Sequence, residues 1–223
     1  MATYIERYWS AVDLQAVSLL QNLASAGALL LNGTYYNASS TTINFANQGF
    51  ARNISLTSVN DLSAVSFTIS GVQNNTVVTN TIAGPNNNTV YTSNVFDIVS
   101  SITVNAPVSG VKAGTGLTGF FPIVNRVTPN SFSINTPTTA YSIGFVTENT
   151  DGCTYEIYES LTDVSGNGET YLSLVNDSSF ISIGGPYSNI TQILQKNDVC
   201  SNILVKVTPT LATSTLFMQF LQF

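Results

Sequence analysis

The side chains that could perform nucleophilic catalysis are few. The chain contains no histidine, and both Ser-His-Asp and Cys-His triads need an imidazole that exchanges protons near neutral pH. A Ser–Lys pair would have to use Lys112, Lys196 or Lys206, and no spacing ties any of these lysines to a serine. The lack of histidine and of a Ser–Lys spacing predicts that the chain is not an enzyme, and the acidic segments in the next paragraph lead to the same prediction.

Two acidic segments have spacings that suggest other chemistry. Glu156 and Glu159 could be the paired carboxylates of a glycosidase, but residues three apart on a strand point to opposite faces. Segment 163–168, DVSGNG, has the oxygen spacing and the sixth-position glycine that open a calcium loop. Leu174 stands where such a loop needs a bidentate glutamate, so a turn between strands explains the segment better. We predict no metal and no cofactor.

The two cysteines, Cys153 and Cys200, could form a disulfide. A chain assembled in a cytoplasm would instead keep both reduced. With no histidine and no third cysteine, they complete no zinc-ligand set. We predict two free thiols.

The composition favours β structure and a surface that packs against neighbours. Charged residues make up 8% of the chain, against about 25% in an average soluble domain. Asn, Thr and Ser replace them, and these residues suit strand surfaces and turns. The net charge is −6 and the six basic residues do not cluster, so no nucleic acid is expected as a partner. No apolar window reaches the roughly 18 residues of a membrane span, and the apolar stretch near the N-terminus is too interrupted for a secretion signal.

The N-terminal part of the sequence has the apolar spacing of a helix. Apolar residues recur at helical spacing before Gly27, at Val12, Ala16, Leu19, Leu20 and Leu23. This spacing predicts a short N-terminal helix within an arm of residues 1–26. The helix would either pack on its own β domain or dock on a neighbouring subunit.

From residue 28 onward the period changes to two, as in β-strands. Val65, Phe67 and Ile69 alternate with Ser and Thr, and further short strands follow at intervals of about 8–12 residues. Residues 109–119 are rich in Gly and Thr, and the strand pattern restarts after them. We therefore predict an all-β protein with two β-sandwich domains, Ig-like or jelly-roll-like, at 27–113 and 114–223.

Several strand motifs resemble those of small β-sandwich structural proteins of tailed bacteriophages. The matching segments are LQNLASAGALLLNG (20–33), VSFTISG (65–71), TIAGPN (81–86), 96–104, VKAGTG (111–116), NSFSI (130–134) and TYEIY (154–158). The resemblance extends over residues from about 16 to 160. It implies a virion protein with Ig-like or jelly-roll domains, assembled in the host cytoplasm.

Two hypotheses for function follow. The first is a capsid decoration or cement protein, which binds the major capsid protein or other virion proteins and forms a homo-oligomer such as a trimer. The alternative is a head-fibre or tail-fibre adhesion module that binds host-surface glycans through exposed aromatic side chains. Tyr35, Tyr36 and Tyr187 are the candidates for that role, unless they cap the ends of sheets.

The two ends of the chain are unusually apolar, whereas domain ends are usually polar. We predict that the N-terminal helix and the C-terminal strand are buried against other subunits or the shell; the competing view is that both fold back onto their own domain. The candidate interface residues are Leu19, Leu20, Leu23, Phe217, Phe220 and Phe223.

Overall fold

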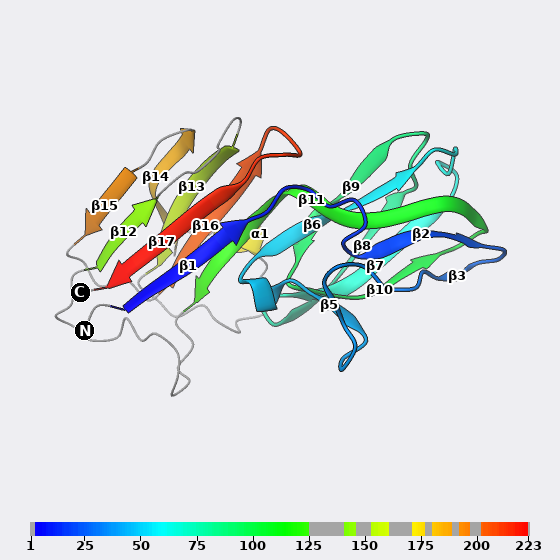
Figure 1. The fold of residues 1–223 in the computed structure, drawn as a ribbon, viewed down its shortest axis with the longest axis horizontal. Helices are drawn as coiled ribbons and strands as arrows, with labels where there is room; N and C mark the ends of the chain where they lie inside the picture. The colour runs from blue at the N-terminus through cyan, green and yellow to red at the C-terminus, as the bar shows by residue number, and fades with distance from the viewer. Residues whose placement is uncertain are drawn as a thin grey trace. The chain divides into compact units, whose positions relative to one another are not determined.

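The computed structural model describes residues 3–124, 141–145, 153–160, 171–176, 180–188, 192–196 and 202–222. These residues form antiparallel β-sheets (Figure 1). The helical segments among them are the 3-10 turn η1 (Ala46–Gln48) and the single turn α1 (Tyr171–Leu174). The predicted all-β class is confirmed.

The chain divides into two compact units. Residues 12–119 form one, and residues 1–11 with 120–223 form the other. In chain order, the first unit is therefore inserted into the second. The domain limits predicted from the sequence, 27–113 and 114–223 after an arm of residues 1–26, stay a prediction that independent folding of the fragments would test.

The unit of residues 12–119 contains two sheet regions. In one, the strand order is β4 (Tyr36–Asn37), β5 (Thr42–Asn44), β10 (Ile98–Val104), β7 (Ser66–Gln73) and β8 (Thr76–Ala83), with β3 (Gly27–Ala28) also paired to β10. In the other, β9 (Thr89–Phe96), β6 (Ala51–Ser58) and β11 (Val108–Val124) are neighbours, and β2 (Ser18–Leu23) pairs with β11.

Strand β7 shows how the period-two pattern builds this unit. Phe67 and Ile69 are fully buried, whereas Thr68 and Ser70, which alternate with them, lie on the outer face and are hydrogen-bonded to strand β8. The hairpin from β7 to β8 turns at Asn74 and Asn75, whose φ angles are 48° and 62°. Asparagine tolerates this left-handed conformation, which a tight hairpin requires. Each sheet buries one apolar face, as the two sheets of a β-sandwich do, so the unit is sandwich-like.

Both open sides of this sandwich-like unit are bridged. On one side β2 pairs with β11 and β3 pairs with β10, so the segment that carries both strands joins the two sheet regions. On the other side Asn80 Oδ1 accepts a hydrogen bond of 2.8 Å from the Ser93 backbone N–H, which links β8 to β9. Asn94 Nδ2 donates to the Thr79 carbonyl at 3.4 Å. Polar side chains therefore shield sheet edges that would otherwise be exposed.

The predicted N-terminal helix is wrong. The described part of residues 1–26 contains strands β1 (Thr3–Trp9) and β2, and no helix. Backbone groups in the predicted helix instead bond to distant residues: the Val17 N–H donates to the Ala113 carbonyl at 3.1 Å, and the Leu19 N–H donates to Asn32 Oδ1 at 2.9 Å. These tertiary hydrogen bonds replace the local ones that a helix would make, so apolar spacing alone did not decide the structure.

The second unit also contains two groups of strands. One sheet has the order β1, β17 (Leu216–Gln222), β12 (Tyr141–Phe145) and β15 (Gln192–Lys196). The other group is β14 (Phe180–Ser188), β13 (Cys153–Ser160), β16 (Asn202–Pro209) and the last residues of β11. Trp9 is 1% exposed and packs edge-on against Phe121, with ring centroids 5.5 Å apart. Other buried core residues of this unit are Tyr155, Ile157, Val205, Val207, Leu216 and Met218.

Candidate binding surfaces

Residues 18–31, here called the β2–β3 ribbon, present apolar side chains to solvent. Leu20 and Leu30 are each 64% exposed, and Leu19 is 43% exposed. Leu23 is half-buried. No charged residue occurs between Asp13 and Arg52 in the sequence. The ribbon is therefore an apolar surface within a long uncharged stretch of chain.

Polar side chains inside the ribbon hold its backbone. The Gln21 side-chain amide mimics a neighbouring strand: its Nε2 donates to the Leu30 carbonyl at 3.1 Å, and the Leu30 N–H donates to its Oε1 at 3.0 Å. The Gly110 N–H donates to Asn22 Oδ1 at 2.6 Å, which ties the ribbon to strand β11. Because these amide atoms are used internally, Leu19, Leu20 and Leu30 are the large apolar side chains of the ribbon that remain exposed for contact with another molecule.

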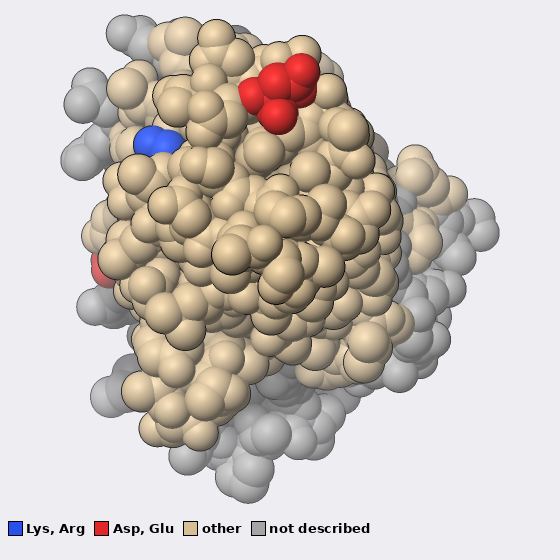
Figure 2. Space-filling model, turned by 90° about the vertical axis from the view of Figure 1, so that its right-hand side faces the viewer, with Lys and Arg blue, Asp and Glu red and all other residues tan. Residues whose placement is uncertain are grey.

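The surface around the end of the ribbon carries little charge. Figure 2 views the molecule from the side where β2 and β3 end in Figure 1, and uncharged residues cover most of the face. The acidic and basic side chains that are visible lie toward its margins. An uncharged face of this kind is compatible with burial against another protein, because few ions would have to be desolvated.

The C-terminal strand β17 has a different setting. It lies between β1 and β12, so its backbone is hydrogen-bonded on both sides. Leu216 and Met218 are buried, whereas Phe217 is half-buried on the other face, with its ring centroid 4.6 Å from that of Tyr8. Phe220 pairs through its backbone with Ile5 and Ile143. Phe223 lies outside the described residues.

The six candidate interface residues do not form one segment of the fold. The three leucines belong to the unit of residues 12–119, and the three phenylalanines belong to the other unit. Burial of either group against another subunit or the shell stays a prediction.

The carboxylates considered for catalysis lie on opposite faces of strand β13. Glu159 is 9% exposed, whereas Glu156 lies on the half-exposed face. Glu156 Oε2 accepts hydrogen bonds from Lys206 Nζ at 3.2 Å and from the Tyr158 hydroxyl at 2.8 Å. Burial raises the pKa of Glu156, but these two bonds and the Lys206 charge outweigh burial and leave the pKa lowered. Glu156 is thus held ionised in a cross-strand ion pair, which does not suit a general acid.

The cysteines and the segment considered for metal binding are buried or lie outside the described residues. Cys153 is buried, and Cys200 and segment 163–168 lie outside the described residues. Among the residues that the structure describes, no group of three His, Cys, Asp or Glu side chains is placed to hold a metal ion.

Two of the three aromatic candidates support their own sheets. Tyr187 is half-buried, with its ring centroid 5.4 Å from that of Tyr155. Tyr35 packs edge-on against Phe45 and Phe50, with ring centroids 5.4 and 5.8 Å away. Tyr36 is 40% exposed, which makes it the most accessible of the three.

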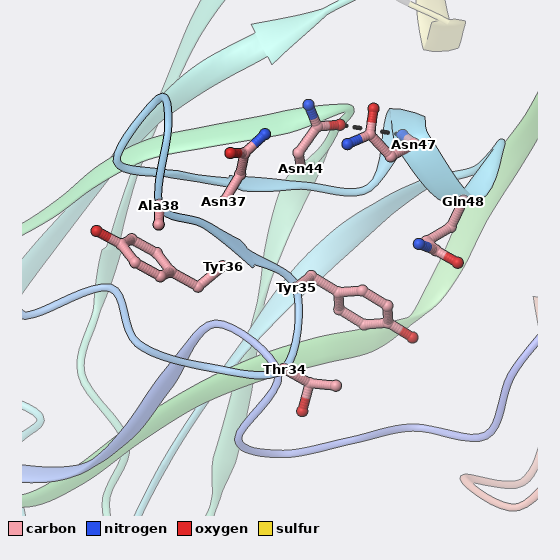
Figure 3. A pocket seen from close by; sticks show the side chains of 8 residues that line it. All are labelled: Thr34, Tyr35, Tyr36, Asn37, Ala38, Asn44, Asn47 and Gln48. Carbon is pink, nitrogen blue, oxygen red and sulfur yellow. Dashed lines mark hydrogen bonds between the residues drawn. The ribbon is translucent and has the colours of Figure 1, made fainter.

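A shallow cavity of about 280 Å³ lies at the β4–β5 hairpin and the 3-10 turn that follows (Figure 3). We call it the Tyr36 pocket. Its lining residues are Thr34, Tyr35, Tyr36, Asn37, Ala38, Asn44, Asn47 and Gln48. Its two tyrosines were predicted from the sequence as exposed aromatic candidates, whereas its four amide side chains were not among the predicted site residues. A signal was present, since these amides fall within twelve residues of one another in an uncharged segment.

No protein-family model matches the chain, and neither does any curated protein sequence. The resemblance to phage structural proteins therefore rests on the strand motifs alone. In the described part of the chain, no helix is both long enough and apolar enough for a membrane span.

Proposed function

We propose that this chain is a structural protein of a tailed-phage virion, and that it decorates or cements the capsid by binding the major capsid protein. The observation that carries the proposal is the β2–β3 ribbon, which exposes Leu19, Leu20 and Leu30 from a sandwich-like unit. The phage-like strand motifs support the same assignment. In this proposal both units are β-sandwiches of the Ig-like or jelly-roll type, and the protein acts in the virion after assembly in the host cytoplasm.

Two properties of the ribbon favour a contact with another protein. Apolar area removed from water stabilises a complex by about 25 cal/mol per Å², less the cost of ordering the partners. The amides of Gln21 and Asn22 already fix the ribbon backbone through Leu30 and Gly110. Little further ordering is therefore needed when the ribbon meets a flat apolar surface of the shell.

The chain is proposed to reach the shell as a homo-oligomer, with a trimer suited to local threefold positions. Because few charges lie near the ribbon, electrostatic repulsion between copies would be weak. Light scattering of the purified protein measures this directly. A strictly monomeric protein at high concentration would remove the oligomer from the proposal and leave shell binding to be tested separately.

The test of shell binding is incorporation into particles. The wild-type chain and a Leu20→Ser/Leu30→Ser variant are expressed in cells that assemble the virion, and copies per purified particle are counted by quantitative mass spectrometry. The matched control is Val77→Ser, because Val77 is 79% exposed on β8 in the same unit but away from the ribbon.

We expect many copies per particle for the wild type and the control, and a large loss for the ribbon variant. Absence of the wild-type chain from purified particles would overturn the virion assignment. Equal incorporation of all three proteins would remove the ribbon as the shell contact.

A further inference from the structure

We propose that the Tyr36 pocket binds a neutral saccharide, with one face of a pyranose ring resting on the Tyr36 side chain. This goes beyond shell binding, since the pocket and the β2–β3 ribbon are separate parts of the 12–119 unit. The proposal rests on the side chains that line the pocket, on their hydrogen bonds and on the absence of charge among them.

The two tyrosines of the pocket have different roles. Figure 3 shows their rings directed away from each other. The Tyr35 ring is held by its edge-on contacts with Phe45 and Phe50, so it forms a fixed wall. The Tyr36 ring is partly exposed, and an aromatic face of this kind can pack against the C–H groups on one side of a sugar ring. Such rigid aromatic area loses little conformational entropy on binding.

The amides supply the polar part of the site. Asn37 Oδ1 accepts from the Ser39 N–H and Asn44 Oδ1 accepts from the Asn47 N–H, each at 3.0 Å. These bonds orient both side chains and leave their NH₂ groups as donors. Within the described residues, the side-chain amides of Asn47 and Gln48 make no hydrogen bond to protein, so each offers both donor and acceptor atoms. Sugar hydroxyls likewise both donate and accept, which this set of amides matches.

The backbone beneath the pocket is held by the rest of the unit. The Tyr36 N–H donates to the Gly33 carbonyl at 3.0 Å, and the Asn44 N–H donates to the Tyr35 carbonyl at 3.1 Å. The Phe45 N–H donates to the Asp97 carbonyl at 2.8 Å, which anchors the start of the 3-10 turn. A site that is preformed in this way binds without a large ordering cost.

Charge selects against anionic sugars. None of the eight lining residues is charged, so a sialic or uronic acid would find no cationic partner among them. The Thr34 hydroxyl donates to Asp13 Oδ2 at 2.9 Å, which places a carboxylate behind the pocket wall. That carboxylate repels anions. The cavity is also smaller than most drug-sized sites, so it suits one sugar ring of a longer neutral chain.

Saturation-transfer NMR tests the proposal with the full-length protein. The probes are oligosaccharides of glucose, galactose, mannose or N-acetylglucosamine, with sialylated and uronate-containing oligosaccharides as the anionic set. Affinity for any neutral probe that binds is then measured for Tyr36→Ala, Tyr36→Phe and the double variant Asn47→Ala/Gln48→Ala. The matched control is Tyr91→Ala, because Tyr91 is 41% exposed on strand β9 of the same unit.

We expect binding to at least one neutral probe, and a loss of about tenfold or more for Tyr36→Ala, as for an aromatic anchor at the centre of a site. The double amide variant should also lose affinity, whereas Tyr36→Phe and Tyr91→Ala should keep it. Circular dichroism checks that each variant is folded.

The proposal is overturned if no neutral probe binds, if anionic probes bind more tightly, or if Tyr91→Ala weakens binding as much as Tyr36→Ala. If Tyr36→Ala does not fold, the double amide variant decides, and unchanged affinity there also overturns it. None of these results bears on incorporation into particles, so this inference can fail while the proposed function stands.

Discussion

The β2–β3 ribbon and strand β17 are both rich in large apolar residues, but their structural settings are opposite. Strand β17 is paired on both sides, and its residues Leu216 and Met218 are buried within its own unit. Strand β2 pairs with β11 in an irregular register, and its consecutive residues Leu19 and Leu20 are exposed. Apolar content alone therefore does not decide whether the side chains of a strand form core or surface, whereas the hydrogen-bonded neighbours of the strand do.

Truncation of a buried residue in β17 should have the largest effect. Met218 is fully buried, so Met218→Ala should lower the free energy of unfolding by about 2–5 kcal/mol, through lost burial and the cavity left behind. Urea unfolding followed by the fluorescence of Trp9, the sole tryptophan and a core residue of the same unit, measures the change.

The matched substitution in the ribbon is Leu20→Ala, followed by circular dichroism because Trp9 belongs to the other unit. Its side chain is largely exposed, so the change in stability should stay within about 0.5 kcal/mol. A destabilisation as large as that of Met218→Ala would show that the leucines are core residues, and the contrast between the two segments would fail.

An intermediate effect is expected where the ribbon holds its own backbone. Gln21→Ala removes the two hydrogen bonds to the Leu30 backbone, and each such bond contributes about 0.5–1.5 kcal/mol net. The Leu30 amide should therefore exchange with solvent at least several-fold faster, as measured by hydrogen–deuterium exchange NMR. Gln48→Ala is the control, because its side-chain amide has no protein partner in the described structure. An unchanged Leu30 rate would mean that other contacts hold the ribbon.

A small effect of pH on stability is expected in the unit that contains Glu156. The lowered pKa of Glu156 means that its ion pair with Lys206 stabilises the fold fully above the unfolded value of about 4.3. That contribution disappears as the pH falls through the lowered folded pKa. Because both side chains are partly exposed, it is below about 1 kcal/mol.

Glu156→Gln should therefore be less stable than the wild type at pH 7 and nearly equal to it near pH 2, in urea unfolding followed by Trp9 fluorescence. The effect of Gln21→Ala should not change between these pH values, since its hydrogen bonds join neutral groups. If Glu156→Gln lowered the free energy of unfolding equally at both pH values, the effect would be due to packing instead of charge.

The positions of strands could be predicted from the sequence where one face of the sheet is buried and the other is exposed. In β7, the alternation of Phe67 and Ile69 with hydroxyl residues in the sequence reappears as buried and half-buried positions. The helical spacing of Leu19, Leu20 and Leu23 failed because the partners of that segment, Ala113 and Asn32, lie elsewhere in the sequence. Local periodicity contains no information about such pairings.

The Tyr36 pocket was predictable only in part. Tyr36 stood out as an exposed-aromatic candidate because of its residue type. Asn47 and Gln48 reach the pocket because the chain turns through η1 after β5, and a short 3-10 turn leaves no clear periodic signal. Spacing did separate Glu156 from Glu159, because their positions depend on the strand period alone.

The pairing of β1 with β17 has a consequence for the order of folding during synthesis. Thr3 pairs with Gln222, and Trp9 pairs with Leu216, so β1 leaves the ribosome long before its partner strand β17 and must wait for it. The unit of residues 12–119 is complete long before that. Contacts this distant in sequence form late. The unit of residues 12–119 would thus fold on the nascent chain while Trp9 and its neighbours are still unpaired and accessible to chaperones.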